Sequence, residues 1–297
     1  MRHYTTRSHE PKKRSNRHVD VAAASVLRRR DRMANQRDVF QRPLRCERKV
    51  DSVIPWVAVI SALSGYAVGS IPFALLVVRL FGGGRTVRST ELSVPGTGKV
   101  LRSDAVSATA VRLQMGAPFG CLTSLLDMSK AAAVTLTFKY LDPEAAYYLI
   151  AAGFAVVGHV WPVFHRFRGG RGQSPIIGSL FVIDWPAAFI AYPCAQVLGL
   201  VTRSTAWVGR FSPPLIVAGW LYFRFRNLSF VYFALGLFLV RLLAMRREMA
   251  QYAAIRKSGG LRTLSEQLEL LRFSPRVIRA IDRIHRCWSR CVKHRAP

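Results

Sequence analysis

A short loop rich in glycine and arginine joins two apolar stretches of this chain. The loop reads Arg168-Gly169-Gly170-Arg171-Gly172. Glycines allow a backbone to approach a ligand closely and to present its N–H groups, and arginine carries a permanent positive charge. A helix that begins after such a loop can also direct its N-terminus at an anion. The sequence therefore predicts a phosphate site at this loop, close to a membrane surface.

Two charged residues lie inside the apolar stretch Ala117–Phe138. Asp127 and Lys130 are three residues apart, so they share one face of the expected helix. Charges at membrane depth are costly unless they are paired or face a cavity. Two interpretations stay open: a structural ion pair within the membrane, or a pair that lines the site.

A histidine, His159, stands near the polar end of the apolar stretch Ala145–Phe164, shortly before the glycine loop. A single histidine on a helix is more often a hydrogen-bonded core residue than a catalytic one. Because His159 is so close to the loop, we expect it to support the loop from behind.

Charge is distributed unevenly along the 297 residues. The chain has 44 Lys and Arg against 16 Asp and Glu, a formal net charge of +28, and 51% of its residues are hydrophobic. Residues 1–50 contain 15 basic and 5 acidic residues with little apolar periodicity, which predicts a disordered basic arm. Residues 51–250 form the predicted membrane domain. Residues 251–297 form a basic tail with apolar residues at helical spacing, typical of an interfacial amphipathic helix.

The apolar stretches determine the predicted fold class, an all-α integral membrane protein with about seven transmembrane helices. The first stretch contains an uncharged run of 26 residues, Val53–Val78, and a spanning helix needs about 20. Pro72 interrupts it, which predicts a position packed against other helices. The predicted spans are Val53–Phe81, Ala117–Phe138, Ala145–Phe164, two short helices within Ser174–Val201, Phe211–Phe223 and Ser229–Met245. Two short helices are expected within Ser174–Val201 because Asp184, Pro186 and Pro193 interrupt that stretch.

The basic loops suggest an orientation in the membrane. With the amino terminus outside, the glycine-rich loops and the carboxyl tail fall on one face, and the positive-inside rule makes that face cytoplasmic. Arg224, Arg226 and the basic residues 1–50 oppose this orientation. We expect a multi-pass membrane protein.

The glycine loop and its surroundings resemble a known family. The pairs and runs Gly158-His159, Pro162-Val163-Phe164 and Phe167–Gly172 follow one another as in the second signature of the bacterial acyl-phosphate:glycerol-3-phosphate acyltransferases, with Arg171 in place of a lysine. The run Gly69–Phe73 resembles the opening of that family. The resemblance covers roughly residues 53–250 and implies a multi-pass protein of the bacterial plasma membrane. It implies transfer of a fatty acyl group from acyl phosphate to the sn-1 hydroxyl of glycerol 3-phosphate, which gives lysophosphatidic acid for phospholipid biosynthesis.

The first signature of the family falls within residues 85–116, and two registers compete for it. Counting from the first span places Pro95–Arg102 there, which keeps a glycine, Gly96, and an arginine, Arg102. Counting back from the next span places Ser103–Ala110 there, which keeps a serine, an alanine and a threonine, Thr109. Neither register keeps the asparagines. Both substrates carry a phosphate. The glycine loop would hold one of them, and Arg102 or Lys99, together with Ser103 or Thr109, would hold the other.

The resemblance implies roles for individual residues and no metal, cofactor or thiol nucleophile. Near the carboxyl end of the family pattern, Thr202-Arg203 is kept, but the serines that should follow are absent, and Arg246–Ala250 lacks the histidine and asparagine of the third signature. The residues expected in catalysis are Arg171, Arg102, Ser103 and His159. The residues expected to bind substrate phosphate are Arg168, Gly169, Gly170, Gly172, Gly96, Lys99, Thr109 and Arg203.

The lost positions leave two functions open. One is an active, divergent acyltransferase that uses acyl phosphate and glycerol 3-phosphate. The other is a catalytically silent membrane protein that keeps the fold and binds lipid or a membrane partner. The basic tails would attract anionic lipid head groups. We expect no nucleic-acid binding, because the chain has no basic motif with interleaved aromatic residues for stacking.

Overall fold

The computed structural model describes residues 54–257, apart from 85, 88, 95–97, 203 and 205–207, together with residues 279 and 283. The predicted basic arm, most of the predicted tail, Gly96 and Arg203 lie outside these described residues. The helices are α2 (Pro55–Gly69), α3 (Phe73–Phe81), α4 (Ala108–Met115), α5 (Ala117–Leu141), α6 (Tyr147–Val160), a short 3-10 helix (Val163–His165), α7 (Gln173–Ile183), α8 (Trp185–Val201), α9 (Val208–Phe225) and α10 (Leu228–Lys257). Two strands, β1 (Thr90–Ser93) and β2 (Val100–Ser103), pair antiparallel.

The first apolar stretch breaks into α2 and α3 at the predicted position, Ser70–Pro72. Pro72 has no N–H to donate, and a side chain from another helix repairs part of the break, because Lys130 Nζ donates to the carbonyl oxygen of Ile71 at 2.7 Å. Pro72 itself is half-buried, between the buried residues Ser70 and Ala74.

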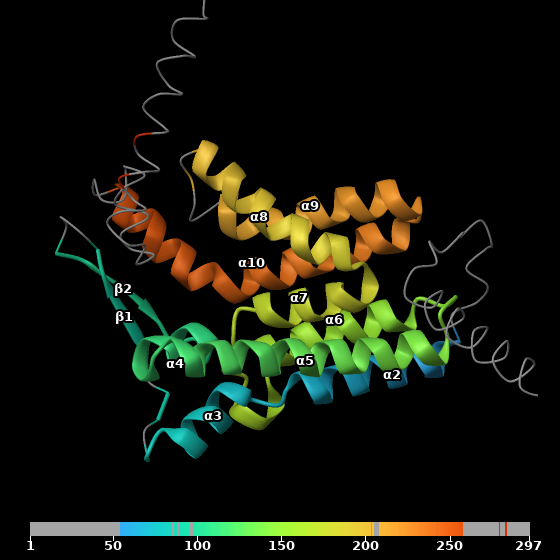
Figure 1. Cartoon of the computed structure of the whole chain (residues 1–297), viewed down its shortest axis with the longest axis horizontal. Coiled ribbons are helices and arrows are strands. Elements are labelled where there is room, and N and C mark those ends of the chain that lie inside the picture. The colour runs from blue at the N-terminus through green and yellow to red at the C-terminus, as the bar shows by residue number, and fades with distance from the viewer. Residues whose placement is uncertain are drawn as a thin grey trace, which may run out of the picture. The chain divides into compact units, whose positions relative to one another are not determined.

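Glycine allows α2 to lie directly on α6. A Cβ atom at Gly65 or Gly69 would collide with the backbone of Ala151 or Ala155, and one at Gly158 would collide with the backbone of α2. Small residues at four-residue spacing let two helices approach closely, as in membrane helix pairs. Figure 1 shows α2, α5 and α6 running side by side, and their facing residues belong to the main apolar core.

The region Ser174–Val201 forms two short helices, as predicted. The break lies at Asp184, which is buried and caps α8 by accepting from the backbone N–H of Ala187. The carboxylate also accepts from Trp220 Nε1 at 2.7 Å and pairs with Arg224 Nε at 2.7 Å, so it ties α9 to the break. Pro193, which we expected to interrupt this stretch, lies inside α8 without ending it.

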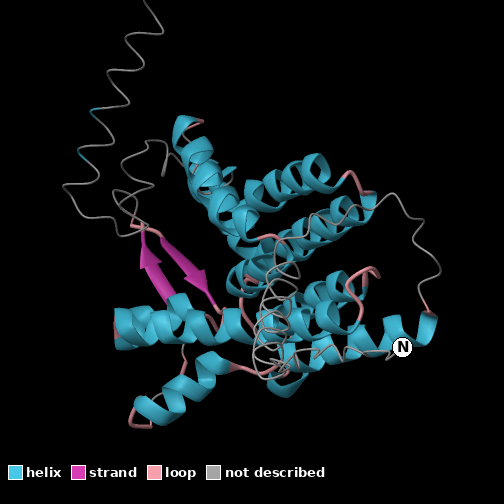
Figure 2. Cartoon of the chain, turned by 45° about the vertical axis from the view of Figure 1, so that its right-hand side comes forward, coloured by secondary structure: helices cyan, strands magenta, loops and turns pink. Residues whose placement is uncertain are grey.

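The loop region before α5 contains a feature that the all-α prediction missed. The antiparallel β-hairpin aligns Thr90 with Ser103 and Ser93 with Val100, and Figure 2 shows it in magenta beside the helices. Leu92 and Leu101 of the hairpin pack against Tyr252 and Ile255 of α10. This contact explains why α10 continues to Lys257, past the expected end at Met245 and past the predicted domain boundary at residue 250.

Within the described residues, three helical segments have the length and composition to cross a membrane: Pro55–Phe81, Tyr147–His165 and Leu228–Lys257. Shorter apolar helices, α7 and α8, and the charged helix α5 pack among them. The expected number of seven spans stays a prediction.

Candidate active site

The glycine loop is held against the end of α6 by close packing. The N–H of Gly170 donates to the carbonyl oxygen of His159 at 3.0 Å, and the carbonyl oxygen of Gly169 accepts from the N–H of Val106 at 3.0 Å. A Cβ atom at Gly170 would collide with the imidazole ring of His159, and one at Gly169 with the His159 carbonyl oxygen. Gly172 has φ +78°, a left-handed conformation that suits glycine, and α7 begins at the next residue. The glycines therefore serve close packing of the loop, and one of the expected phosphate-binding amides is already used internally.

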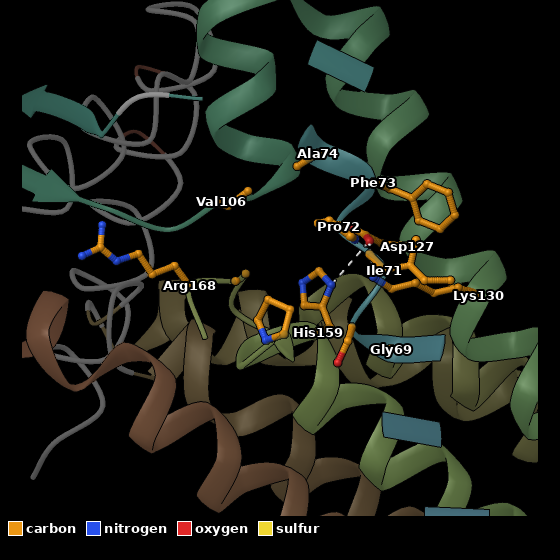
Figure 3. A pocket seen from close by; sticks show the side chains of 14 residues that line it. Gly69, Ile71, Pro72, Phe73, Ala74, Val106, Asp127, Lys130, His159 and Arg168 are labelled. Atoms are coloured by element: carbon orange, nitrogen blue, oxygen red, sulfur yellow. Dashed lines mark hydrogen bonds and ion pairs between the residues drawn. The ribbon is translucent and has the colours of Figure 1, made fainter. Parts of the chain in front are cut away.

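Behind the loop, a buried charge cluster joins α5 to α6. Lys130 Nζ lies 2.8 Å from Asp127 Oδ1, and His159 Nδ1 lies 3.4 Å from the same oxygen. Figure 3 shows these three side chains converging beneath Pro72, whereas Arg168 extends to the opposite side. The cavity among them measures about 10 Å³, which is close to the minimum for one water molecule. Of the two interpretations left open by the sequence, this geometry favours the structural ion pair. His159 connects the pair to the loop, because its ring contacts Asp127 on one side and packs against Gly170 on the other.

On the other side of the loop, Arg171 forms the centre of a polar network. Its Nε and Nη2 atoms donate to Glu248 Oε1 at 2.9 and 2.8 Å, and Nη2 also donates to Ser103 Oγ at 2.8 Å. The Ser103 hydroxyl donates to the same glutamate oxygen at 2.6 Å. Three distant parts of the chain thus meet: the end of β2, the glycine loop and the last third of α10.

Further arginines surround this network. Arg210 Nη1 lies 4.0 Å from Glu248 Oε2. Arg241 is 2% exposed, and its guanidinium donates to the carbonyl oxygens of Arg210 at 2.8 Å and Arg171 at 3.5 Å. Positive charge therefore exceeds negative charge around Glu248. Such an excess in a partly buried place favours binding of an anion.

Two polar cavities border the network. The first, which we call the hydroxyl cavity, measures about 70 Å³ and combines three arginines with hydroxyl groups. Its polar lining residues are Thr90, Ser103, Ser107, Thr109, Arg112, Arg171 and Arg210. The second, the arginine cavity, measures about 700 Å³ and is bordered by the loop, the hairpin and α10. Its polar side chains are those of Ser89, Arg102, Asp104, His165, Arg168, Arg246, Arg247, Glu248 and Gln251.

The strand geometry of β2 separates Arg102 from Ser103. Side chains alternate between the two faces of a strand, so Ser103 is buried against Arg171 whereas Arg102 is exposed. Arg102 lies 3.7 Å from Glu91 and 3.8 Å from Asp104, and it borders only the arginine cavity. Thr109 joins Ser103 in the hydroxyl cavity. The register that begins at Ser103 therefore brings its hydroxyl groups to Arg171, and Lys99 lies on the exposed side of the hairpin, outside both linings.

Sequence reasoning did not find several members of the network. The missed residues are Ser107, Arg112, Arg210, Arg241 and Glu248. Two of them carried a usable signal: Arg241 is a charge inside the apolar stretch of α10, and Glu248 is an acid within a basic run. Arg112 and Arg210 carried none, because their relation to the loop arises only from the packing of α4 and α9.

This fold and this site define a helical membrane protein with an arginine-rich polar site at one end of its helices. A model of the family described as glycerol-3-phosphate acyltransferase matches residues 59–254. The chain belongs to this glycerol-3-phosphate acyltransferase family.

Relatives and a solved structure agree with this family. The chain is similar to the glycerol-3-phosphate acyltransferases of Bartonella henselae, at 35% identity over 48% of this chain and 63% of that protein, and of Brucella anthropi, at 36% identity over 47% and 62%. It thus spans less than two thirds of the length of these two relatives. The Maricaulis maris relative is 33% identical over 55% of this chain and 71% of its own length.

The same fold occurs in the crystal structure of PlsY (YgiH), an integral membrane glycerol 3-phosphate acyltransferase, in its lysophosphatidic acid form. That structure has 20% sequence identity and a TM-score of 0.54, and the match covers 67% of this chain and 93% of the other. The structure with glycerol 3-phosphate gives the same values. The chain therefore has the fold of an integral membrane protein.

Proposed function

We propose that this protein transfers an acyl group from acyl phosphate to glycerol 3-phosphate and forms lysophosphatidic acid in the plasma membrane of a bacterium. The observation that carries the proposal is the hydroxyl cavity. Arg112, Arg171 and Arg210 line one small space together with several hydroxyl groups, and among the described residues Glu248 is the acid that pairs with Arg171 and Arg210. A small molecule that combines a phosphate with hydroxyl groups fits this lining.

Glycerol 3-phosphate is the substrate that we assign to the hydroxyl cavity. Its phosphate would accept from the guanidinium groups of Arg112 and Arg210, since guanidinium binds phosphate with two parallel hydrogen bonds. Its glycerol hydroxyls would bind beside Ser103 and Thr109. The sn-1 hydroxyl then points toward Arg171 and Glu248, at the border between the two cavities.

Acyl phosphate is the substrate that we assign to the arginine cavity. Arg168, Arg246 and Arg247 border it, so its phosphate would meet several cations near Gly169 and Gly170. Neutralising the phosphate makes it a better leaving group. Holding both substrates on either side of Glu248 replaces a bimolecular encounter with a positioned one.

Glu248 is the residue that we assign to accept the proton. Its Oε2 atom is buried, and no hydrogen-bond donor reaches it among the described residues, although Oε1 accepts from Arg171 and Ser103. A buried oxygen of this kind normally has a partner, and the substrate hydroxyl would be that partner. The hydroxyl oxygen forms a bond to the acyl carbon, the bond from that carbon to the phosphate oxygen breaks, and the proton passes to Glu248. Arg171 stabilises the negative charge that develops and donates no proton, because arginine is a poor proton donor.

The test is formation of lysophosphatidic acid by the purified protein in lipid or detergent, from acyl phosphate and labelled glycerol 3-phosphate. We expect product from the wild type and a loss of at least about 100-fold with Arg171→Ala. Arg79→Ala is the matched control, because Arg79 is an exposed arginine at the end of α3 that borders neither cavity. Absence of product from well-folded wild type would contradict the proposal. If that protein still bound acyl phosphate, it would be the catalytically silent form of the family.

A further inference from the structure

Two prolines near the start of α9 leave main-chain carbonyl oxygens without their helical donors. In an α-helix the carbonyl oxygen of one residue accepts from the N–H four residues later, and proline has no N–H. Pro213 therefore removes the donor for the carbonyl of Gly209, and Pro214 removes the donor for the carbonyl of Arg210. Buried carbonyl groups of this kind need other donors.

Side chains of two neighbouring helices supply these donors. Gln196 Nε2 of α8 donates to the carbonyl oxygen of Gly209 at 2.9 Å. Arg241 Nη2 of α10 donates to the carbonyl oxygen of Arg210 at 2.8 Å. Each carbonyl that the proline pair leaves free is thus satisfied by a polar side chain from another helix.

Arg241 also holds the glycine loop by a main-chain carbonyl. Its Nη1 atom donates to the carbonyl oxygen of Arg171 at 3.5 Å, a longer contact than the one to Arg210. The residue four positions after Arg171 is again a proline, Pro175, so the N–H that could serve this carbonyl in α7 is absent. One guanidinium therefore joins the starts of α7 and α9 to α10.

Arg241 and Glu248 contact the same two arginines from one face of α10. They are seven residues apart, about two turns, so they lie above one another on the helix. Glu248 contacts the guanidinium groups of Arg171 and Arg210, at 2.8 and 4.0 Å. Arg241 contacts the main-chain carbonyls of the same two residues. Each of the two arginines is therefore held at its backbone and at its side chain.

The burial of Arg241 is not explained by an acid partner. Its side chain is buried within the membrane-length helix α10, its Nε atom has no hydrogen-bond partner, and among the described residues it forms no ion pair. A charge inside a membrane segment is costly, and such residues bind backbone carbonyls and mark functional sites. Arg241 borders neither polar cavity, so any effect on substrate must pass through the residues that it holds.

We propose that Arg241 is a positioning residue for glycerol 3-phosphate. By donating to the carbonyls of Arg210 and Arg171, it fixes these two backbones so that their guanidinium groups meet in the hydroxyl cavity. The inference rests on the function proposed above, which assigns glycerol 3-phosphate to that cavity. A residue that only stabilised the fold would not favour one substrate over the other.

Arg241→Met tests the proposal, because it removes the donors and keeps most of the side-chain volume. We expect KM for glycerol 3-phosphate to rise by about tenfold or more, since a small displacement of a positioned group can cost about 100-fold. KM for acyl phosphate should change much less, and Arg241→Lys, which keeps a donor, should lie between the wild type and Arg241→Met. Phe230→Ala is the control for lost stability, since Phe230 is buried on α10, stacks on Phe225 and borders neither cavity. It should lower Tm and change neither KM.

Pro214→Ala distinguishes positioning from a general effect of charge or packing. It returns an N–H four residues after Arg210, so adding it to Arg241→Met should recover much of the lost affinity for glycerol 3-phosphate. Pro213→Ala is the matched control, because its N–H would serve the carbonyl of Gly209, which already has a donor. An unchanged KM in Arg241→Met, equal increases for both substrates, or equal recovery by the two alanine substitutions would overturn the proposal.

Hydrogen exchange of the backbone amides tests the same role without turnover. Exchange of the full chain in detergent is measured by mass spectrometry in peptides that cover residues 169–173 and 208–212. We expect both segments to lose protection in Arg241→Met but not in Phe230→Ala, and residues 208–212 to regain it when Pro214→Ala is added. This result from a protein that forms no lysophosphatidic acid would retain the positioning of the two arginines and reject the reaction. Unchanged exchange in both segments would overturn the proposal, whether or not the protein is active.

Discussion

Replacing Glu248 should destabilise the protein and stop its activity, and the two effects can be separated. Glu248 Oε1 accepts from Arg171 Nε, Arg171 Nη2 and Ser103 Oγ, at 2.9, 2.8 and 2.6 Å. Glu248→Ala removes all three contacts and leaves Arg171, Arg210 and Arg241 close together without a carboxylate. Breaking a buried ion pair costs about 3–5 kcal/mol.

The expected cost is lower here because water reaches part of the pair. The side chain of Glu248 is 11% exposed and that of Arg171 is 23% exposed. We therefore expect a loss of about 2–3 kcal/mol, below the range for fully buried pairs. For a domain of this size, 1 kcal/mol shifts Tm by about 2–4 °C, so the expected decrease is about 4–12 °C.

The assay is thermal unfolding in detergent, followed by far-ultraviolet circular dichroism, with and without inorganic phosphate. Phosphate should stabilise Glu248→Ala more than the wild type, because it takes the place of the missing carboxylate. At ten times its Kd, a ligand of the folded state stabilises it by about 1.4 kcal/mol. Glu91→Gln is the control, since Glu91 is 58% exposed and 3.7 Å from Arg102, and such pairs contribute about 0–1 kcal/mol.

Glu248→Gln tests the catalytic part of the reasoning. The amide oxygen can still accept from Arg171, so most of the stability should remain, but the side chain no longer accepts a proton. We expect a loss of activity of about 100-fold or more, as for removal of a general base. If Glu248→Ala unfolded at the same Tm as the wild type, the charge-balance argument would be refuted. Full activity of Glu248→Gln would refute the proton-acceptor role.

Three further predictions concern the supports of the site and its two cavities. Lys130→Ala should lower the free energy of unfolding by about 3–5 kcal/mol, because it leaves Asp127 buried with one remaining partner. Thermal unfolding of the variant and the wild type measures this difference. An unchanged Tm would show that the pair is not structural. Gly170→Ala should abolish activity through collision with the ring of His159, whereas Gly219→Ala should keep it, because a Cβ atom at Gly219 of α9 meets nothing within 4 Å. Equal activity of the two variants would contradict the packing of the loop. Arg112→Ala should raise KM for glycerol 3-phosphate by about tenfold or more, and Arg168→Ala should raise KM for acyl phosphate by as much, since charged hydrogen bonds contribute about 1.5–3 kcal/mol. Steady-state kinetics with each substrate varied in turn measures both constants. A change of both KM values in both variants would contradict the division into two cavities.

The membrane fold followed from local properties of the sequence. The long uncharged stretches predicted helices, because only helices satisfy their own backbone groups in an apolar setting. Pro72 and Asp184 marked breaks that the structure has, since proline removes a donor and aspartate caps a helix start. The hairpin Thr90–Ser103 could not be predicted in the same way, because its stability comes from contacts of Leu92 and Leu101 with α10, far along the chain.

The residues of the candidate site divide in a similar way. The sequence alone identified the glycine loop, Arg171 and the family, because glycine spacing and arginine chemistry are readable from neighbouring positions. It left two registers open before α5, since Arg102 and Ser103 are adjacent in sequence and only the alternation of a strand sends them to opposite sides. Glu248 meets Arg171 because folding brings the last third of α10 to the side of the loop that carries Arg171. Local chemistry was thus determined by the sequence. The pairing of Arg171 with Glu248, 77 residues apart, was decided by the tertiary structure. Opposite charges attract appreciably only when folding brings them within a few ångströms of each other.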